Sequence, residues 1–260
     1  MSKNFTLITG AGRGLGKAFA HELASMGRNI LLVSLSGEGL ADFSAELSTA
    51  YKIKTDYLEI DLSKKKSVYK VTDWANRYEV DVLINNAGIG GTSRFDLIEP
   101  EIIDRMIQVN VYATAMLTRL LLPNLKRQTK SFILNVSSMA AFGPIAFKTV
   151  YPATKAFVLF FSRGLYEEFR YTNVFVSVLH PGPMRTNPEV VRRIDKLGIW
   201  GEIGLLSTQK IASIAVTGLF RRDSLIIPGF FNKLNWFLIQ IVPIWIRLPV
   251  VSGIVRKEVK

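Results

Sequence analysis

Three side chains in the second half of the chain have the types and spacing needed for proton transfer. Tyr151 and Lys155 stand four positions apart in the sequence YPATK and therefore share one face of a helix. A tyrosine hydroxyl has an ordinary pKa near ~10, and a neighbouring ammonium group lowers that pKa by favouring the phenolate. Such a phenol can exchange a proton with a carbonyl or alcohol oxygen near neutral pH. Ser138, thirteen residues before Tyr151, could donate a hydrogen bond to the same oxygen and stabilise the charge that develops there.

A second candidate site lies near the start of the chain, in the sequence TGAGRGLG (Thr9–Gly16). Glycines allow a tight turn and let backbone amides come close to a phosphate, and the positive end of the following helix adds to the attraction. The spacing G-x-G-x-x-G fails because Leu15 stands at the third glycine position. The spacing T-G-x-x-x-G-x-G does fit, through Thr9, Gly10, Gly14 and Gly16. The sequence therefore predicts a phosphate-binding turn.

Both candidate sites lie in an alternation of short apolar runs and segments of helical apolar spacing. The runs are Phe5–Gly10, Asn29–Ser34, Thr55–Asp61, Val80–Gly88, Ser131–Ser138 and Val174–Gly182. The helical segments are Leu15–Met26, Gly39–Tyr51, Val68–Tyr78, Ile102–Leu125 and Pro152–Tyr171. This alternation predicts an α/β fold, a doubly wound parallel β-sheet in three αβα layers. A last strand at Leu225–Gly229 ends this single domain at residues 1–229, and residues 230–260 form an apolar, basic C-terminal helical extension.

The remaining polar motifs stand near the carboxyl ends of the later strands. NNAG (Asn85–Gly88) ends the fourth strand, and Ser138 ends the fifth. Asn110 lies in the long helix between them, and YPATK opens the helix after the fifth strand. Open parallel sheets bind their ligands at this edge. We therefore expect the glycine turn and these motifs to meet in one site.

In this order and at these spacings, the motifs give the chain a specific likeness. It resembles the short-chain dehydrogenase/reductase family over about residues 4–228. The resemblance implies a Rossmann-like domain that transfers a hydride between a nicotinamide cofactor and a carbonyl compound or secondary alcohol. It also implies that Tyr151 is the general acid and base and that Lys155 lowers its pKa and binds the nicotinamide ribose. By the same resemblance, Ser138 positions the substrate oxygen and Asn110 holds a water of the proton relay.

The resemblance further implies a set of cofactor-binding positions. They are Gly10, Gly12, Arg13, Gly14, Leu15, Gly16, Ser34, Ser36, Asp61, Leu62, Asn86, Ala87, Gly88, Tyr151, Lys155, Pro181, Gly182 and Thr186. Among them, Asp61 is expected to contact the adenine and Thr186 the nicotinamide amide, while Asn85 is expected to tie strands together beside the site. Two positions depart from the family pattern. Pro152 replaces a small polar residue, which the first turn of a helix tolerates, and Ala113 replaces a glycine.

The end of the second strand distinguishes NADP(H) from NAD(H). An acid there would bind the ribose 2′-hydroxyl and repel a 2′-phosphate. The sequence has Ser34, Leu35 and Ser36 at this point, and the nearest acid, Glu38, lies past the turn. Arg13 in the glycine turn has a guanidinium suited to a phosphate, although Leu35 stands where many NADP enzymes carry an arginine. We expect NADP(H) to be favoured over NAD(H).

The composition restricts the other partners. A net charge of +12 favours anionic ligands such as acidic lipid or phosphate-bearing molecules. The chain has no cysteine and only two imidazoles, those of His21 and His180, so we expect no metal site. The run Lys64–Lys66 is typical of a solvated helix start, and because no nucleic-acid motif accompanies it, we expect no nucleic-acid partner. The family resemblance implies a homo-oligomer.

The segment Pro188–Ser207 occupies the place where the family carries a variable, substrate-covering segment. It mixes apolar with basic side chains, which suits an apolar substrate with an anionic end; an apolar stripe packed on the sheet would show the same pattern. We expect a reductase of a lipophilic ketone or aldehyde. Two alternatives stay open: an NAD-dependent dehydrogenase of small polar alcohols, and a dinucleotide-sensing protein without turnover. The intact serine, tyrosine and lysine argue against the second.

The stretch FFNKLNWFLIQIVPIWIRLP (Phe230–Pro249) is the most apolar part of the chain. Thirteen uncharged residues separate Lys233 from Arg247, and Pro243 interrupts them, whereas a membrane span needs about 20 apolar residues. The amides and basic residues fall on one side of a helical wheel, a pattern that favours a helix lying in a lipid interface. A helix packed on a partner subunit or over the substrate cleft would show the same pattern.

The start of the chain bears on the location of the protein. A strand-like run begins at Phe5, which leaves no room for a signal peptide. We therefore expect a cytoplasmic protein whose extension contacts the inner face of a membrane peripherally.

Overall fold

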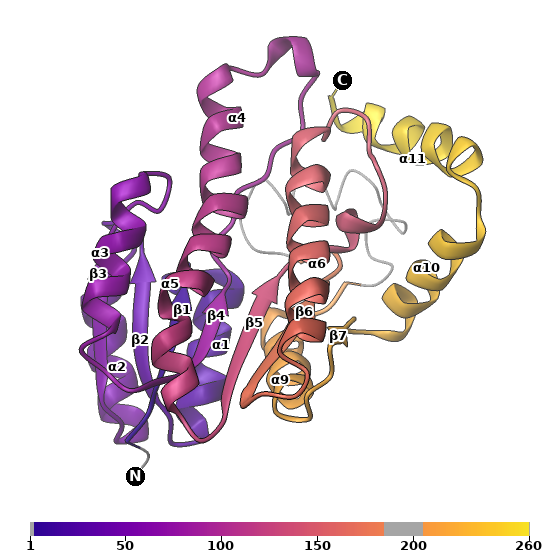
Figure 1. Ribbon diagram of the computed structural model, residues 1–260. Coiled ribbons are helices and arrows are strands. Elements are labelled where there is room, and N and C mark those ends of the chain that lie inside the picture. The colour runs from indigo at the N-terminus through magenta and orange to yellow at the C-terminus, as the bar shows by residue number, and fades with distance from the viewer. Residues whose placement is uncertain (1–2, 185–204, 260) are drawn as a thin grey trace.

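The computed structural model describes residues 3–184 and 205–259 and contains a parallel sheet of seven strands (Figure 1). In chain order the strands are β1 (Phe5–Thr9), β2 (Asn29–Ser34), β3 (Thr55–Glu59), β4 (Val80–Asn85), β5 (Ser131–Val136), β6 (Val174–Leu179) and β7 (Leu225–Ile226). Their order across the sheet is β3-β2-β1-β4-β5-β6-β7. The predicted α/β fold with a doubly wound, Rossmann-like parallel sheet is confirmed, including its last strand.

The direction in which the chain crosses the sheet reverses after β3. The chain runs outward from β1 through β2 to β3 and then returns to place β4 on the other side of β1. Doubly wound sheets bind ligands at the carboxyl ends of the strands that flank this reversal. The glycine turn follows β1 and the NNAG sequence follows β4, so the topology brings both to that point.

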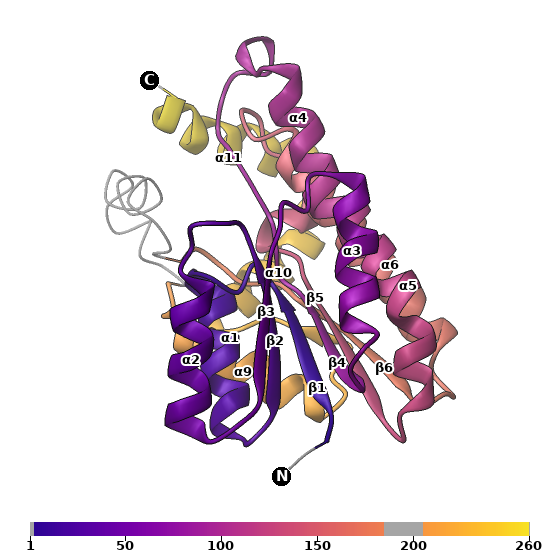
Figure 2. The same ribbon diagram turned by 90° about the vertical axis from the view of Figure 1, so that its left-hand side faces the viewer.

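Helices cover both faces of the sheet (Figure 2). One layer holds α1 (Gly14–Ser25), α2 (Leu40–Tyr51) and α9 (Thr208–Phe220), and the other holds α3 (Lys65–Ala75), α5 (Thr114–Arg127) and α6 (Val150–Glu168). Side chains that alternate along a strand divide between two cores, so that Ile8 packs in the α1 layer and Leu7 in the α3 layer. Because both faces are covered, the strands need continuous apolar runs, which is the pattern that predicted them.

The long helix predicted at Ile102–Leu125 consists of three parts. α4 (Pro100–Ile107) is followed by a π-helical segment, η2 (Gln108–Ala113), before α5 continues to Arg127. A π-helical turn inserts an extra residue, and such turns are frequent at functional sites. The segment contains Asn110, whose side chain is buried. Apolar spacing predicted one continuous helix because the helical period is the same on both sides of the insertion, which shifts only the phase of the pattern.

The C-terminal extension forms two helices, α10 (Phe230–Ile241) and α11 (Ile244–Val259). The break falls at Pro243 because proline lacks the amide hydrogen that a continuing helix would use. Among the residues that the structure describes, no helix combines the length and the apolar character that a membrane span requires. The amides and basic residues that share one side of the helical wheel differ in exposure. Asn232 is buried against the domain, whereas Lys233 is exposed.

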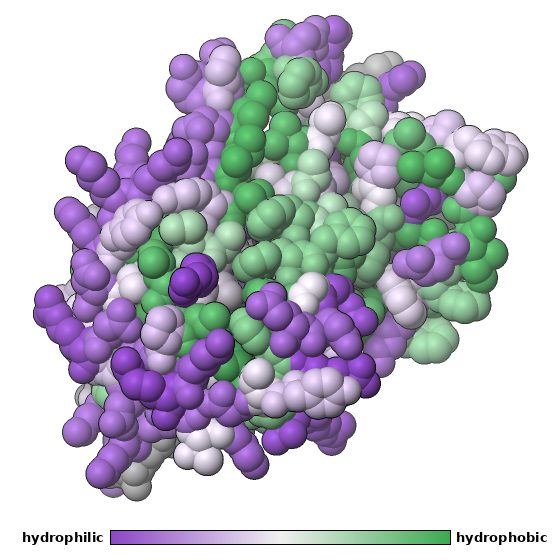
Figure 3. All heavy atoms as spheres, viewed as in Figure 1, coloured by the Kyte–Doolittle hydropathy of each residue, from purple (hydrophilic) through white to green (hydrophobic). Residues whose placement is uncertain are grey.

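The face of the molecule in Figure 3 has two parts of contrasting polarity. Polar side chains gather over α3, and apolar side chains gather around α6 and along α10 and α11. The extension therefore adds its apolar surface to the side of the molecule that carries α6.

Candidate active site

The glycine turn and the loop after β4 are hydrogen-bonded to one another. Thr9 Oγ1 accepts hydrogen bonds of 3.0 Å from the backbone amides of both Asn86 and Ala87. In return, Asn86 Nδ2 donates to the carbonyl oxygens of Thr9 at 2.9 Å and Gly10 at 3.1 Å. The side chain of Asn86, predicted to bind the cofactor, therefore holds the turn in place.

Close packing makes this turn dependent on its glycines. Gly10 and Gly14 have φ angles of +65° and +55°, which favour glycine. A Cβ atom on Gly16 would lie only 2.0 Å from the Gly10 carbonyl oxygen. The turn thus brings the backbone directly to the first turn of α1, where unpaired amides and the helix dipole attract a phosphate. These features fit a dinucleotide pyrophosphate. Leu15 is buried in the core, so only its backbone faces this site.

Tyr151 and Lys155 begin α6 and pack against the loop that follows β4. Lys155 Nζ lies 5.9 Å from the centroid of the Tyr151 ring and donates a 2.8 Å hydrogen bond to the carbonyl oxygen of Val136, at the end of β5. A Cβ atom on Gly88 would lie 3.1 Å from Lys155 Nζ, and one on Gly90 would lie 3.0 Å from the Tyr151 ring. Burial lowers the pKa of Lys155 to about 8. The group therefore remains an ammonium at neutral pH.

The two serines at the end of β5 have different surroundings. Ser137 is buried, and its hydroxyl donates a 2.8 Å hydrogen bond to the carbonyl oxygen of Lys155. Ser138 is only half-buried and caps the short helix η3 (Met139–Phe142), where its Oγ accepts a 3.1 Å hydrogen bond from the amide of Ala140. Because Oγ accepts there, its own proton is available for another acceptor. This difference supports the choice of Ser138.

Two asparagines brace the strands and loops around this site. Asn110 exchanges hydrogen bonds of 2.9 and 2.8 Å with the backbone of Ile89 and donates a third, of 2.9 Å, to Thr154 Oγ1. Asn85 Nδ2 donates to Asn135 Oδ1 at 2.8 Å and to a threonine of α5 at 2.9 Å. Asn85 thus ties β4 to β5, the structural part expected from the sequence, and Asn110 holds the loop beside Tyr151 in a way that the sequence did not predict.

His180 belongs to the site although sequence reasoning considered it only as a metal ligand. Its Nδ1 lies 2.9 Å from the carbonyl oxygen of Ser138, and a carbonyl can only accept, so Nδ1 carries the proton. Burial of this side chain lowers its pKa to about 4, with a further lowering by the Lys155 charge, against the hydrogen bond to Ser138 that raises it. The signal in the sequence was a histidine between a buried strand and Pro181.

The side chain of Glu38 folds back onto the end of β2. Ser34 donates a hydrogen bond to its carboxylate, and Arg13 Nε lies 3.3 Å from the same group. Gly37 and Gly39 flank it with φ angles of +82° and +70°, left-handed values that reverse the chain on either side of Glu38. The expectation that no acid reaches the end of this strand is therefore wrong, because an acid from past the turn returns to it.

The other predicted cofactor-binding positions lie along the same edge. Asp61 follows β3, and although burial alone would raise the pKa of its carboxyl, hydrogen bonds from Ser63 hold that pKa below its usual range. Leu62 is buried, and Ser36 is exposed beyond β2. Thr186 and most of the predicted substrate-covering segment lie outside the described residues.

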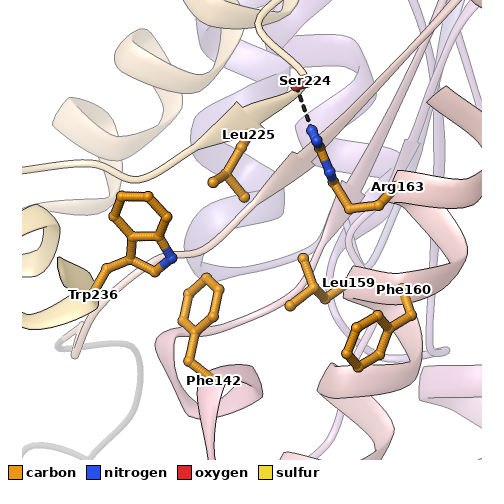
Figure 4. Close-up of a pocket in the computed structure, with 7 residues that line it drawn as sticks. All are labelled: Phe142, Leu159, Phe160, Arg163, Ser224, Leu225 and Trp236. Carbon is orange, nitrogen blue, oxygen red and sulfur yellow. Dashed lines mark hydrogen bonds between the residues drawn. The ribbon is translucent and has the colours of Figure 1, made fainter. Parts of the chain in front are cut away.

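An open apolar pocket of about 610 Å³ lies where α6, η3 and α10 meet (Figure 4). Its lining residues are Phe142, Leu159, Phe160, Arg163, Ser224, Leu225 and Trp236. The rings of Phe142 and Trp236 meet at an angle of 62° with centroids 6.4 Å apart. Phe142 is part of the short helix that Ser138 caps, so the extension contacts that helix at this pocket.

Comparison with known proteins gives consistent relatives. The family model described as short chain dehydrogenase matches residues 4–196. The very-long-chain 3-oxoacyl-CoA reductase of Homo sapiens is 30% identical over 256 residues, which cover 96% of this chain and 78% of the relative. Hydroxysteroid dehydrogenase-like protein 1 of Gallus gallus is 32% identical over 93% of this chain and 73% of the relative. Very-long-chain 3-oxoacyl-CoA reductase-A of Danio rerio is 35% identical over 73% of this chain, a match that spans 60% of that relative.

Two solved structures share the fold of this chain at somewhat lower sequence identity than these relatives. A bulky-bulky ketone specific alcohol dehydrogenase from Comamonas testosteroni superposes with a TM-score of 0.78 at 27% identity, covering 92% of this chain and 91% of that chain. A short-chain dehydrogenase from Sphingobium yanoikuyae in complex with NADPH also gives a TM-score of 0.78 at 27% identity, covering 91% of this chain and 92% of that one.

The buried imidazole predicts a specific loss of stability in acid. The pKa of His180 is about 4 in the folded chain and 6.5 in its ordinary state, so between these values the unfolded chain binds more protons. Stability from this group is complete above pH 6.5, falls as the pH drops from 6.5 to about 4, and changes no further below 4 because both states are then protonated. We expect the free energy of unfolding of the wild type, relative to His180→Asn, to fall by about 3 kcal/mol over this range in urea titrations. His21→Asn is the matched control and should keep the wild-type loss; an equal loss in His180→Asn would contradict the prediction.

Proposed function

This chain belongs to the short-chain dehydrogenase family, and we propose that it is an NADP(H)-dependent reductase of a lipophilic ketone or aldehyde. The observation that carries the proposal is the position of Tyr151 and the buried Lys155, which adjoin the loop that is hydrogen-bonded to the glycine turn. A proton-transfer pair beside a dinucleotide site is the arrangement that hydride transfer to a carbonyl requires.

The reduction divides between the cofactor and the chain. The nicotinamide cofactor supplies the hydride for the carbonyl carbon. Tyr151 gives its hydroxyl proton to the carbonyl oxygen, which becomes the alcohol oxygen, and Tyr151 is left as a phenolate. The Lys155 ammonium stabilises that phenolate, and Ser138 donates a hydrogen bond to the substrate oxygen while charge develops there. Oxidation of an alcohol uses the same groups in the opposite direction.

The residues that would hold the cofactor lie at the carboxyl edge of the sheet, and each group of them would bind a different part of it. The backbone of Gly10–Gly16 would take the pyrophosphate, Asp61 the adenine and Lys155 the ribose. The backbone of Asn86–Gly88 and of Pro181–Gly182 would border the nicotinamide end. Asn110 holds the Ile89 backbone beside Tyr151, which supports its proposed place next to the proton relay.

Two observations support a lipophilic substrate. Relatives that align with most of this chain are named for very-long-chain 3-oxoacyl-CoA reduction, and a similar structure is named for bulky ketones. Apolar side chains also gather on the face that carries α6, α10 and α11 (Figure 3), and α6 is the helix that contains Tyr151 and Lys155. We propose that substrate arrives from that side.

Removal of one hydroxyl tests the reaction. Tyr151→Phe should lower turnover by about 10²–10⁴-fold, because the proposed general acid loses its proton, while the Kd for NADPH should change little. The loss of NADPH absorbance over a panel of long-chain and cyclic ketones measures turnover, and NADPH fluorescence measures binding. Tyr171→Phe is the matched control, because Tyr171 is 92% exposed and is not among the predicted site residues. Residual activity in Tyr151→Phe above a tenth of wild type would remove Tyr151 from its role.

The preference for NADP(H) rests on Arg13 and Ser34. Both are engaged by Glu38, so a 2′-phosphate would have to take the place of the Glu38 carboxylate on these two groups. The exchange is favoured by the divalent charge of the phosphate and by the fit of a guanidinium to it. A ribose 2′-hydroxyl, in contrast, could leave the carboxylate in place and donate to it.

Substitution of the acid should therefore shift cofactor selectivity. Glu38→Gln removes a negative charge beside the phosphate, and we expect binding of NADPH and of 2′,5′-ADP to tighten about tenfold while that of NADH changes less. Calorimetric titration measures all three ligands, with Asp42→Asn as the charge-matched control, because Asp42 is an exposed acid on α2. Equal changes in the Kd values of NADPH and NADH would show that Glu38 does not discriminate between a phosphate and a hydroxyl at the ribose 2′ position. Tighter binding of NADH than of NADPH by the wild type would overturn the NADP(H) proposal itself.

We also propose that the extension contacts a membrane surface. Its exposed apolar side chains are Phe230, Phe231, Leu234, Phe237, Leu238, Ile241, Ile244, Trp245, Ile246, Val250 and Ile254. Large exposed apolar patches mark sites of contact with a protein or a membrane, and the net charge of +12 suits acidic lipid. The cytoplasmic location and the homo-oligomer expected from the sequence stay predictions.

Lipid contact is testable with substitutions matched in exposure. Phe230, Trp245 and Phe160 are each 73% exposed, but Phe160 lies on α6. The double variant Phe230→Ser, Trp245→Ser should weaken flotation with anionic liposomes about tenfold or more, because two large side chains leave the interface. Phe160→Ser should float like the wild type. A wild type that stays with the soluble fraction would refute membrane contact.

A further inference from the structure

The turn that carries Ser138 is held at both ends by residues from distant parts of the chain. At its start, His180 Nδ1 donates to the Ser138 carbonyl oxygen at 2.9 Å, and Met139 donates its amide to the Pro181 carbonyl at 3.1 Å. At its end, Arg247 Nη1 of α11 donates a 2.9 Å hydrogen bond to the carbonyl oxygen of Phe142. The C-terminal extension thus fixes one end of the helix η3 that Ser138 caps.

The contact of Arg247 with this turn is close. A Cβ atom on Gly143 would lie 3.0 Å from Arg247 Nη1 and 3.3 Å from its Cζ, so the guanidinium lies directly against the backbone of Gly143. Arg247 Nε is buried, and no hydrogen-bond partner for it is present among the described residues. Partial burial of a guanidinium costs free energy, and its charged hydrogen bond to a carbonyl is stronger than a neutral one. Such a contact orders the turn more than an exposed side chain would.

Phe142 connects the two fixed ends. Its ring lies 4.5 Å from the His180 ring, centroid to centroid. The ring centroid of Phe142 also lies 6.4 Å from that of Trp236 on α10, and both of these side chains are drawn in Figure 4. A shift of the Phe142 backbone would therefore move the ring that packs on His180, and the His180 ring also donates a hydrogen bond to the Ser138 carbonyl. Arg247 and Trp236 hold Phe142 from the backbone and from the ring respectively.

We infer that Arg247 is a positioning residue of the reaction, which acts through Ser138 by holding the turn that begins there. The C-terminal extension is then part of the catalytic site as well as an apolar surface. The inference rests on the proposed role of Ser138 in the reaction. Arg247 itself does not contact the reacting atoms.

Loss of the guanidinium should reduce turnover without loss of cofactor. Arg247→Met should lower kcat/KM for ketone reduction by about 10- to 100-fold and leave the Kd for NADPH within about twofold, because the cofactor turn lies on other elements. Lysine keeps the charge but lacks the planar set of guanidinium donors, so the kcat/KM of Arg247→Lys should lie between those of the wild type and Arg247→Met. The matched control is Arg221→Met, at the exposed end of α9, which should behave like the wild type.

Chemical rescue separates positioning from general destabilisation. Arg247→Ala should regain at least about a fifth of the wild-type kcat/KM in millimolar methylguanidine, while Arg221→Ala should not respond. Equal losses of turnover, NADPH affinity and melting temperature in both Arg247→Ala and Arg247→Lys, without rescue, would mean that Arg247 is only structural and would overturn the inference.

A double-mutant cycle distinguishes failure of this inference from failure of the proposed function. If Arg247 acts through Ser138, Arg247→Met should add no further loss of kcat/KM to that of Ser138→Ala. Multiplicative losses would show that Arg247 acts independently of Ser138 and would refute the inference alone. Full activity in Ser138→Ala would instead refute the proposed role of Ser138, on which the inference rests.

Discussion

Lys155 is a cation held almost out of reach of water, and the carboxyl edge of the sheet is built around it. The side chain is 4% exposed, and burial lowers its pKa to about 8, so the fold pays a real cost to keep an ammonium there. The carbonyl oxygen of Val136, at the end of β5, offsets part of that cost. A Cβ atom at position 88 would lie 3.1 Å from the ammonium, so the glycine lets the loop after β4 pack closely on it. The same loop is hydrogen-bonded to the glycine turn, so the place of the ammonium and the place of the phosphate site are linked.

Amide side chains carry much of this linkage. Asn86 binds the carbonyl oxygens of Thr9 and Gly10 at the end of β1, Asn85 joins β4 to β5, and Asn110 holds the backbone of Ile89. A carboxamide has a donor and an acceptor at one end, and it can therefore join two backbone segments without adding charge near Lys155. A charged side chain in these positions would change the electrostatics of the proton-transfer pair as well as the packing.

The C-terminal extension links the proposed membrane contact to the proposed active site. Its outer face exposes large apolar side chains, and its inner face holds the Ser138 turn through Arg247 and touches Gly182 through Asn232. A surface suited to lipid and a contact with the catalytic turn thus lie on the same pair of helices. Substrate that is dissolved in lipid would meet the enzyme at the side from which its turn is held.

The sequence by itself determined the fold class, the seven strands and the order of the motifs, because apolar runs and glycine spacing are local properties of the chain. It also selected Ser138, Tyr151 and Lys155, since parallel strands deliver their carboxyl ends to one edge. It did not reveal the π-helical segment around Asn110, because one inserted residue shifts the phase of the apolar pattern but leaves its period unchanged. Only the tertiary structure returned Glu38 to Ser34 through two left-handed glycines, and placed His180 and Arg247 on the Ser138 turn. Those contacts join segments that are distant in the chain, and no local pattern records which backbone carbonyl a side chain will meet.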